Sequence, residues 1–205
     1  VSDKLDLSKA APILCAGITT YTPLKKWGVK KGTRVGVIGL GGLGHMAVQL
    51  AAAMGAEVTV ISRSTKKEEE AKAIGAKGIL SSEDKEAMKK ASNSFDFIID
   101  TIPVKHDLNT YTPLLDVDGT LTLVGQIGPM EEPMTAPLVF GRRRVAGSLI
   151  GGIKETQEVL DFCAEHNIHP VCEIIEPNKV NKAWDTLLND NPAQRFVMDM
   201  SKLEV

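Results

Sequence analysis

Short apolar stretches alternate with longer amphipathic ones along most of the chain, and this pattern predicts how its first part folds. Short runs rich in Val, Ile, Leu and Phe are typical of buried strands, whereas apolar positions three and four apart are typical of helices. The runs predict about six strands, at residues 35–38, 57–61, 78–80, 95–100, 119–124 and 144–150. The segments around them predict helices at residues 8–27, 45–54, 65–74, 82–91, 106–115 and 138–142. Strands and helices that alternate in this way form a parallel sheet with helices on both faces, so we expect an α/β fold.

The pattern changes after residue 153. A predicted helix at residues 156–166 is followed by a strand at 172–175, a helix at 180–188 and a strand at 195–199. These two strands do not follow the alternation in which each helix leads to a neighbouring parallel strand. We therefore divide the chain into residues 1–153 and 154–205, and expect the second part to belong to another domain.

A glycine-rich turn joins the first predicted strand to the helix that follows it. The turn consists of Gly39, Leu40, Gly41, Gly42, Leu43 and Gly44. Gly39 permits a tight turn, Gly41 lets a pyrophosphate approach the backbone, and Gly44 lets the helix lie close to the sheet. The free N–H groups at the start of the helix then face the phosphates. Such glycines also occur in ordinary turns, but the strand before and the helix and strand after favour a dinucleotide site in a Rossmann-type doubly wound parallel sheet.

The end of the second predicted strand indicates which dinucleotide binds. Proteins that prefer NAD place an Asp or Glu there to hold the ribose hydroxyl groups. This chain has Ser62, Arg63 and Ser64 instead, followed by Lys67, with no acidic residue from position 58 to 67. A guanidinium and hydroxyl groups suit a 2′-phosphate. Lysines in the first turn of a helix beginning near residue 65 would also oppose the macrodipole unless an anion lies there. The pattern predicts NADP, the alternative being a solvated basic surface.

Composition limits the classes of partner. The 205 residues include 24 Lys and Arg against 26 Asp and Glu, a net charge of −2, which gives no field that implies nucleic acid or an acidic membrane. The sequence shows no signal peptide and no apolar run long enough to span a bilayer, so we expect no membrane partner. Three dispersed cysteines are too few for a disulfide framework and favour a reducing, cytoplasmic location.

Five separated motifs agree in order and spacing with those of one known family. They are Cys15-Ala-Gly-Ile-Thr-Thr-Tyr21, Gly39-Leu-Gly-Gly-Leu-Gly-His45, Ser62-Arg63-Ser64, Leu123-Val124-Gly125 and Gly147-Ser-Leu-Ile-Gly-Gly152. From about residue 14 to residue 200 the chain resembles the cinnamyl alcohol dehydrogenase branch of the zinc-dependent medium-chain alcohol dehydrogenases. The resemblance implies an oxidoreductase that moves hydride between NADPH and an aldehyde, or its primary alcohol, with zinc polarising the carbonyl group.

The resemblance also implies roles for individual residues. Cys15 would be a ligand of the catalytic Zn²⁺, although a lone Cys between apolar residues is usually a small buried hydrophobe. The contacts to the 2′-phosphate would be Ser62, Arg63, Ser64 and Lys67. The contacts along the cofactor and around its nicotinamide would be Thr19, Thr101, Val124, Gly125, Ser148 and Ile150. No residue of this chain receives a catalytic role.

The family has an N-terminal domain, with further zinc ligands, that the printed sequence does not contain. We therefore expect the chain to be the NADP(H)-binding part of a longer enzyme, with residues 154–205 completing a GroES-like catalytic domain. One thiolate cannot form a tetrahedral zinc site, so we expect no turnover by the chain alone. We expect uncovered apolar side chains in its second part, at Val159, Phe162, Trp184, Leu187 and Phe196. Family members pair the last strands of their sheets, here residues 145–149, so we expect a homodimer.

Two other functions were weighed. A methyltransferase also has a glycine-rich loop, but it would need an acid where this chain has Ser62 and Arg63. A non-catalytic NADPH-binding or dimerisation module stays open as an interpretation of the chain, and the sequence upstream of it would discriminate.

The sequence also contains cysteines and histidines whose pattern indicates neither a metal site nor an acid or base. Cys163, His166, His169 and Cys172 are evenly spaced, but they lie on a predicted helix and strand separated by a proline and fit no usual metal pattern. His45, at the start of a predicted helix, is expected to face the cofactor without acting as an acid or base.

Overall fold

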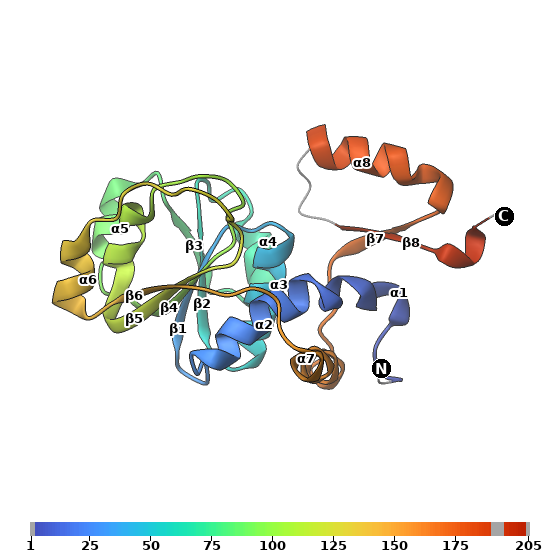
Figure 1. The fold of residues 1–205 in the computed structure, drawn as a ribbon, viewed down its shortest axis with the longest axis horizontal. Coiled ribbons are helices and arrows are strands. Elements are labelled where there is room, and N and C mark those ends of the chain that lie inside the picture. Colours follow the sequence, from blue (N-terminus) through green and yellow to red (C-terminus); the bar gives the residue numbers. More distant parts are fainter. Residues whose placement is uncertain (1–2, 190–194, 204–205) are drawn as a thin grey trace.

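A parallel sheet forms the larger part of the molecule in the computed structural model, which describes residues 3–189 and 195–203. Its strand order is β3-β2-β1-β4-β5-β6 (Figure 1). The strands are β1 (Arg34–Ile38), β2 (Glu57–Ser62), β3 (Gly78–Ser81), β4 (Phe95–Asp100), β5 (Leu115–Leu123) and β6 (Arg144–Gly147). Strand order reverses between β1 and β4, as it does in doubly wound dinucleotide-binding sheets. The predicted Rossmann-type α/β fold is therefore confirmed.

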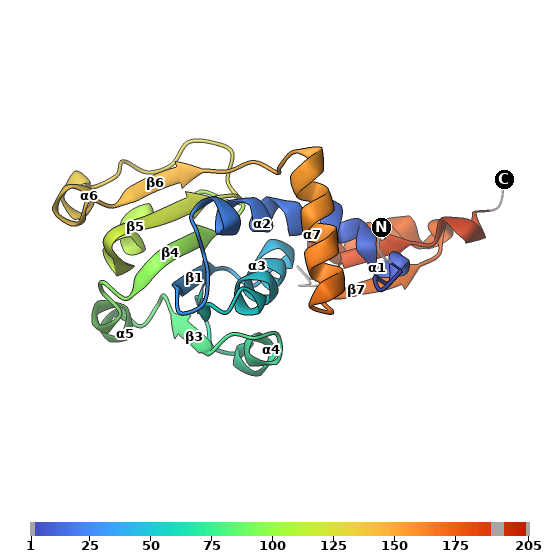
Figure 2. The same cartoon turned by 90° about the horizontal axis from the view of Figure 1, so that it is seen from below.

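Helices cover both faces of this sheet. One face carries α2 (Ala16–Lys26), α3 (Gly42–Ala53), α4 (Glu68–Ala73) and α7 (Ile153–Glu165), as Figure 2 shows for α2, α3 and α7. The other face carries α5 (Lys85–Lys90) and the 3-10 turns η2 (Leu108–Thr110) and η3 (Thr112–Leu114). Val60 faces the first cluster and its neighbour Ile61 the second, and both are fully buried. Burial on both faces explains why these strands are continuously apolar.

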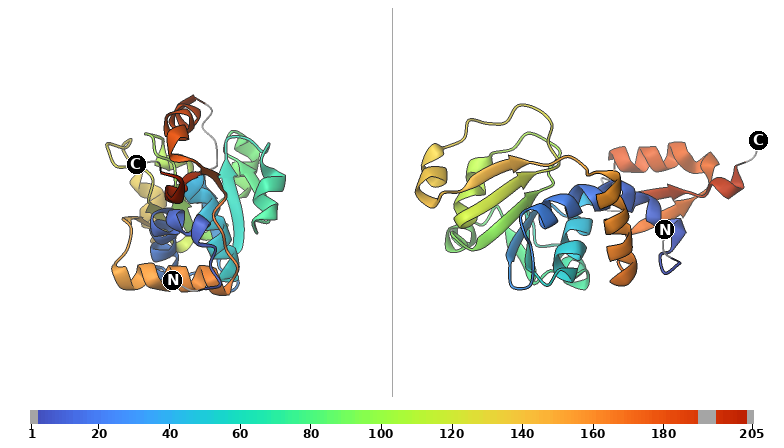
Figure 3. Two further views of the ribbon diagram at one scale, coloured as in Figure 1. Left: turned by 90° about the vertical axis from the view of Figure 1, so that its right-hand side faces the viewer. Right: turned by 60° about the horizontal axis from the view of Figure 1, so that its bottom comes forward.

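A second, smaller unit lies beside the main sheet (Figures 1 and 3). It consists of β7 (Cys172–Ile175), η4 (Pro177–Lys179), α8 (Val180–Asn189), β8 (Arg195–Met198) and η5 (Met200–Lys202). The two strands pair in parallel, so the segment is itself a strand–helix–strand crossover. The expectation that these strands break the alternation is wrong, because the alternation continues in a separate sheet.

Helix α7 packs against α2, in the apolar cluster on one face of the main sheet. Its residues Val159 and Cys163 are fully buried in the cluster that also contains α2 and α3, and Phe162 lies 5.7 Å from Tyr21 between ring centroids. The expectation that Val159 is uncovered is therefore wrong. Phe162 is also partly buried against the same cluster. Dividing the chain at residue 153 would instead place this residue outside the first part. The division itself stays a prediction.

Helix α8 contributes several of the exposed apolar side chains of the second unit. Trp184 is 63% exposed and Leu187 is 40% exposed, as expected for an element without a covering partner. Phe196, on the neighbouring strand, is partly covered. Helix α8 lies at the outside of the molecule in Figure 1, away from the main sheet.

Several elements begin or end elsewhere than the apolar pattern predicts. The helix expected at residues 106–115 is two 3-10 turns, because Pro113 lacks the N–H that a continuous helix needs. The helix expected at residues 82–91 starts later and is capped by Asp84, whose carboxylate accepts the N–H groups of Glu86 and Ala87. The last strand of the sheet ends at Gly147, three residues before the predicted end.

The N-terminal helical segment is broken into three pieces. They are α1 (Leu7–Ala10), the 3-10 turn η1 (Ala11–Leu14) and α2. Asp6 caps α1 by accepting the N–H of Ser8. Pro12 lies at the start of η1, where its missing N–H costs nothing. The break places Cys15 at a non-helical position, with φ −120° and ψ −73°, directly before α2.

Candidate functional site

The predicted site residues gather at the carboxyl edge of the main sheet. Backbone hydrogen bonds of 2.9 to 3.1 Å tie the loops that leave neighbouring strands there. The N–H groups of Gly39, Thr101, Val124 and Ser148 donate to the carbonyls of Ile61, Ile38, Asp100 and Leu123, respectively. This is the edge at which doubly wound sheets bind ligands. Of the predicted cofactor residues, only Thr19 comes from elsewhere, in helix α2.

The glycines of the loop after β1 have the three properties predicted from the sequence. Gly39 has φ +88°, a conformation that side chains disfavour. A Cβ atom on Gly44 would lie 2.2 Å from the Gly39 carbonyl oxygen. Gly41 faces open space, with no atom within 4 Å of an added Cβ. The loop is therefore closed where the backbone packs and open where a pyrophosphate would approach.

Helix α3 begins inside the glycine loop, at Gly42, and not at residue 45 as predicted. Its first N–H groups and the positive end of its macrodipole consequently belong to the loop itself. This arrangement favours an anion in front of Gly41 and Gly42.

Arg195 of β8 lies against this helix start, and the sequence analysis did not identify it. A Cβ on Gly42 would lie 2.5 Å from its Nη2 atom. Its Nη1 atom is buried and has no hydrogen-bond partner in the described ranges 3–189 and 195–203. Burial lowers the pKa of the guanidinium, opposed by the nearby thiols of Cys15 and Cys172. A buried guanidinium with a free donor at a helix N-terminus fits a bound phosphate. Nothing local in the sequence could reveal this, because only the fold brings β8 to the loop.

The residues after β2 form an exposed turn with basic side chains. The carbonyl of Arg63 accepts a hydrogen bond from Ser81 Oγ at 3.2 Å, and Ser64 Oγ accepts the N–H of Lys66 at 3.1 Å. In the described part of the chain the Arg63 guanidinium makes no ion pair. No carboxylate ends β2, whose last residue is Ser62. The turn thus presents an uncompensated cation where NAD-binding sheets present an acid.

One of the two arguments for NADP at this turn is wrong. Helix α4 begins at Glu68, so Lys66 and Lys67 precede it and do not lie in its first turn. That turn contains Glu68, Glu69 and Glu70, which suit the macrodipole. The electrostatic strain that we expected from the lysines is absent from the described helix, and the case for NADP depends on Arg63 and its neighbours.

The loops after β4 and β5 touch beside the glycine turn. Thr101 Oγ donates to the Ile38 carbonyl at 2.6 Å, and its oxygen lies 2.9 Å from the Cβ that Gly39 lacks. A Cβ on Gly125 would lie 2.5 Å from the Thr101 carbonyl carbon. Thr101 and Gly125 are therefore fixed by backbone packing, which leaves little freedom in this wall of the site.

A buried carboxylate follows directly in the same wall. Asp100 is 1% exposed and accepts the N–H of Ile102 at 3.0 Å. Its other oxygen lies 2.6 Å from His106 Nε2. Burial raises the pKa of Asp100, and the bonds to Ile102 and His106 oppose part of that effect. The pair fixes the loop after β4 against the sheet.

The loop after β6 carries the residues assigned to the nicotinamide end. Ile150 has φ +41°, which is strained for a β-branched residue, and it is half exposed. The next residue, Gly151, is pressed against Thr22 and Ile18 of α2, at 2.5 and 2.8 Å from an added Cβ. Thr19, on the same helix, is 6% exposed. Strain of about 1 to 3 kcal/mol is typical of binding sites, and here α2 holds the strained loop in place.

Zinc does not fit the described residues as a complete site. Cys15 is exposed, as a ligand should be. Within residues 3–189 and 195–203, however, no group of three or more His, Cys, Asp or Glu side chains could hold a metal ion. Cys163 of the evenly spaced Cys and His set is buried in the core, where burial raises the pKa of its thiol to about 12. Cys15 by itself supplies one of the four ligands that structural and catalytic zinc sites need.

His45 does not face an open site, contrary to expectation. Its side chain is 1% exposed and contacts the carbonyl of Gly41 and the carboxylate of Glu70. It therefore joins the glycine loop to helix α4.

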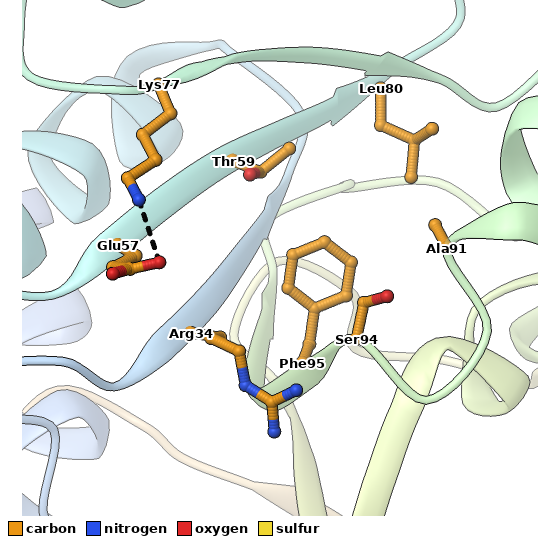
Figure 4. A pocket seen from close by; sticks show the side chains of 8 residues that line it. All are labelled: Arg34, Glu57, Thr59, Lys77, Leu80, Ala91, Ser94 and Phe95. Carbon is orange, nitrogen blue, oxygen red and sulfur yellow. Dashed lines mark ion pairs between the residues drawn. The ribbon is translucent and has the colours of Figure 1, made fainter.

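A hollow of about 300 Å³ lies far from these loops, at the amino ends of β1 to β4 (Figure 4). The charged groups that line it already have partners. Lys77 pairs with Glu57 at 2.8 Å, and Arg34 pairs with Asp96 and with Asp116. This hollow therefore offers no free charge to a ligand.

Comparison with known proteins agrees with this geometry. The model of the family described as zinc-binding dehydrogenase matches residues 42–165, more than half of the chain. The chain belongs to the zinc-binding dehydrogenase family.

Three similar proteins carry more specific names. The chain is 50% identical over 206 residues to the NADP-dependent alcohol dehydrogenase C of Mycobacterium bovis, covering 99% of this chain and 59% of that enzyme. A cinnamyl alcohol dehydrogenase from Sorghum bicolor (SbCAD4) superposes with a TM-score of 0.93 at 39% identity, covering 100% and 60% of the two chains. The CAD from Helicobacter pylori, solved in complex with NADP(H), gives 0.85 at 44% identity, covering 97% and 57%. The chain thus spans about three fifths of the length of these relatives. The resemblance to NADP-dependent alcohol and cinnamyl alcohol dehydrogenases is confirmed.

No helix of the described residues is long and apolar enough to cross a membrane.

Proposed function

We propose that the chain is the NADP(H)-binding part of a zinc-dependent alcohol dehydrogenase of the cinnamyl alcohol dehydrogenase type. The complete enzyme would transfer hydride between NADPH and an aldehyde, or from a primary alcohol to NADP. Named relatives at up to 50% identity support the reaction class. The described residues support the cofactor, because they form an open glycine loop, a buried guanidinium in front of it and a basic turn after β2.

The loops at the sheet edge divide the cofactor among them in this proposal. The glycine loop, the start of α3 and Arg195 hold the pyrophosphate by N–H groups and charge. Ser62, Arg63, Ser64 and Lys67 surround the 2′-phosphate. Thr101 lies along the dinucleotide, while Val124, Gly125 and the strained loop at Ser148 and Ile150 line its nicotinamide end with Thr19. The bound cofactor would supply the hydride, while these residues position it.

The observation that carries the cofactor assignment is the unpaired guanidinium of Arg63 at the end of β2. We expect calorimetric titration of the chain to give a lower Kd for NADPH than for NADH. Replacing Arg63 by Ala should weaken NADPH binding by about ten- to a hundredfold, because a charge-assisted hydrogen bond is lost, and leave NADH binding unchanged. Arg142→Ala, which removes an arginine paired with Asp118 at the amino end of β6, is the matched control and should change neither. Tighter binding of NADH than of NADPH by the unaltered chain would refute the assignment.

Zinc dependence belongs to the same proposal, with Cys15 as one ligand and the others outside the printed sequence. Because Cys15 by itself cannot hold the metal, we expect the chain alone to bind NADPH without turnover. The measurement is the loss of NADPH absorbance with cinnamaldehyde or benzaldehyde in the presence of Zn²⁺. Sustained NADPH oxidation that depends on the aldehyde would show that the described chain is a sufficient catalyst.

We propose three further properties of the complete enzyme. Residues 154–205 would complete a GroES-like catalytic domain, a role consistent with the exposed Trp184 and Leu187 of α8. The chain would form a homodimer through the free edge of β6, near residues 145–149. The protein would act in the cytoplasm.

A further inference from the structure

A buried histidine joins the two places where the proposed cofactor carries phosphate. His45 lies in the first turn of α3, directly behind the glycine loop, and is 1% exposed. Its Nδ1 atom lies 2.9 Å from the Gly41 carbonyl oxygen, and its Nε2 atom lies 2.8 Å from Glu70 Oε1. Gly41 belongs to the pyrophosphate loop, whereas Glu70 belongs to α4, which follows the basic turn after β2.

Both ring nitrogens therefore face oxygen atoms that can only accept. A peptide carbonyl never donates, and an ionised carboxylate does not donate either. A neutral imidazole has one N–H, so it can donate to one of the two oxygen atoms. At the other contact, the lone pair of the ring nitrogen would face a lone pair of the oxygen atom. The imidazolium form has two N–H groups and satisfies both. A cation at the start of a helix opposes the macrodipole, and the carboxylate of Glu70 offsets that cost.

The second oxygen of the same carboxylate faces a residue of the proposed 2′-phosphate site. Lys67 Nζ lies 4.0 Å from Glu70 Oε2, at the outer limit of an ion pair. The two acidic neighbours on α4, Glu68 and Glu69, instead pair with Lys72, at 3.1 and 3.3 Å. A continuous chain of polar contacts thus runs from Gly41 through His45 and Glu70 to Lys67.

We infer that His45 and Glu70 are positioning residues for the 2′-phosphate of NADP(H): the imidazolium neutralises and orients Glu70, and Glu70 orients Lys67. This inference rests on the proposed function. Without His45, the Glu70 carboxylate would lose its partner at Oε1, and its negative charge beside Lys67 would repel an incoming phosphate. With His45 present, the His–Glu pair carries no net charge, so the turn keeps the full positive charge of Arg63 and Lys67.

The test measures the preference of the chain for NADPH over NADH, given as the ratio of their Kd values from calorimetry. NADPH and NADH both contain the pyrophosphate, so a change in pyrophosphate binding alters both Kd values equally and cancels in the ratio. The loss of the contact between His45 and Gly41 is such a change. We expect His45→Gln to lower the preference for NADPH about fivefold, as is typical for coupled neighbouring residues. Adding Glu70→Gln to this variant should restore part of the preference, because it removes the uncompensated carboxylate.

A fragment titration and a matched variant complete the test. We expect His45→Gln to weaken binding of adenosine 2′-monophosphate more than binding of adenosine 5′-monophosphate, and measurable binding of the latter also shows that the variant is folded. Glu69→Gln removes a carboxylate from the same helix turn without contacting His45, and should leave the preference within twofold of the unaltered chain.

The outcomes separate this inference from the proposed function. If the unaltered chain prefers NADPH but His45→Gln keeps that preference, or the double variant loses more of it than the single one, the inference is wrong and the proposed function stands. If the unaltered chain shows no preference for NADPH, the cofactor assignment itself fails.

Discussion

Gly41 and Gly44 lie three residues apart in one loop, yet their surroundings differ completely. Gly44 is required by the fold, because a side chain there would overlap the Gly39 carbonyl, whereas the space beside Gly41 is open. The sequence predicts the packing role of Gly44, since the third glycine of this motif lies where the helix start is packed closely. It could not find Arg195 or the partners of His45, because both contacts join segments distant in sequence.

The two glycines should therefore respond differently to the same added methyl group. Gly44→Ala should lower the free energy of unfolding by about 2 kcal/mol, because a backbone carbonyl must move, and weaken NADPH binding as a consequence. Gly41→Ala should leave stability within about 0.5 kcal/mol and still weaken NADPH binding, because the methyl group fills the space for the pyrophosphate. Urea unfolding and calorimetric titration of both variants are the measurements. Equal losses of stability would show that Gly41 is also a packing position.

Whole elements could be predicted where the apolar pattern was strong. Strands β1, β2 and β4 begin and end within one residue of their predicted positions, because each is rich in Val, Ile or Phe and bounded by turns. The helix expected at residues 106–115 was wrong because that prediction gave the apolar spacing more weight than Pro113. The helix expected at 65–74 begins only at Glu68. The parallel pairing of β7 and β8 was missed because strand partners depend on the whole fold and not on local spacing.

Helix α7 gives a test of element packing through Cys163. Burial raises the pKa of this thiol to about 12, from an ordinary value of 9.0, so the folded state keeps it neutral. The unfolded chain ionises first, so this contribution is complete below about pH 9 and is lost as the pH rises toward 12. At pH 10 the loss should be about 1.4 kcal/mol.

The measurement compares unfolding free energies of the unaltered chain and of Cys163→Ala between pH 8 and pH 10. We expect the variant to be less stable at pH 8 by about 1 kcal/mol, because it leaves a small cavity, but to lose less stability as the pH rises. Parallel pH profiles for the two proteins would show that the thiol ionises with equal ease in both states, contrary to its burial on α7.

At the scale of the whole molecule, two surfaces remain without partners in the described residues. Strand β6 pairs only with β5, and its Val145 is 38% exposed. Helix α8 exposes Trp184 and Leu187 in the second unit. An apolar sheet edge can add a strand from another chain, which is the basis of the proposed homodimer. The sequence could indicate both surfaces through the resemblance, but the burial of Val159 shows that pattern alone could not say which apolar residues stay uncovered.

The proposed dimer predicts a specific effect of charge on β6. We expect the chain to elute as a dimer in size-exclusion chromatography with light scattering, and Val145→Lys to convert it to a monomer, because two like charges would meet across the paired edges. Val180→Lys, at a similarly exposed valine on α8, should leave the dimer intact. A monomeric unaltered chain, or a variant that stays dimeric, would place the contact elsewhere.

Arg195 extends from the small sheet to the glycine loop at the start of α3. This contact has a thermodynamic consequence for ligand binding. An anion held jointly by that guanidinium and the backbone of Gly42 touches both sheets at once. Its binding energy must then depend on how the sheets are oriented to each other, and by reciprocity its presence must narrow the range of orientations they adopt. The relative orientation of the two sheets would therefore differ between the chain with a bound phosphate compound and the chain without one.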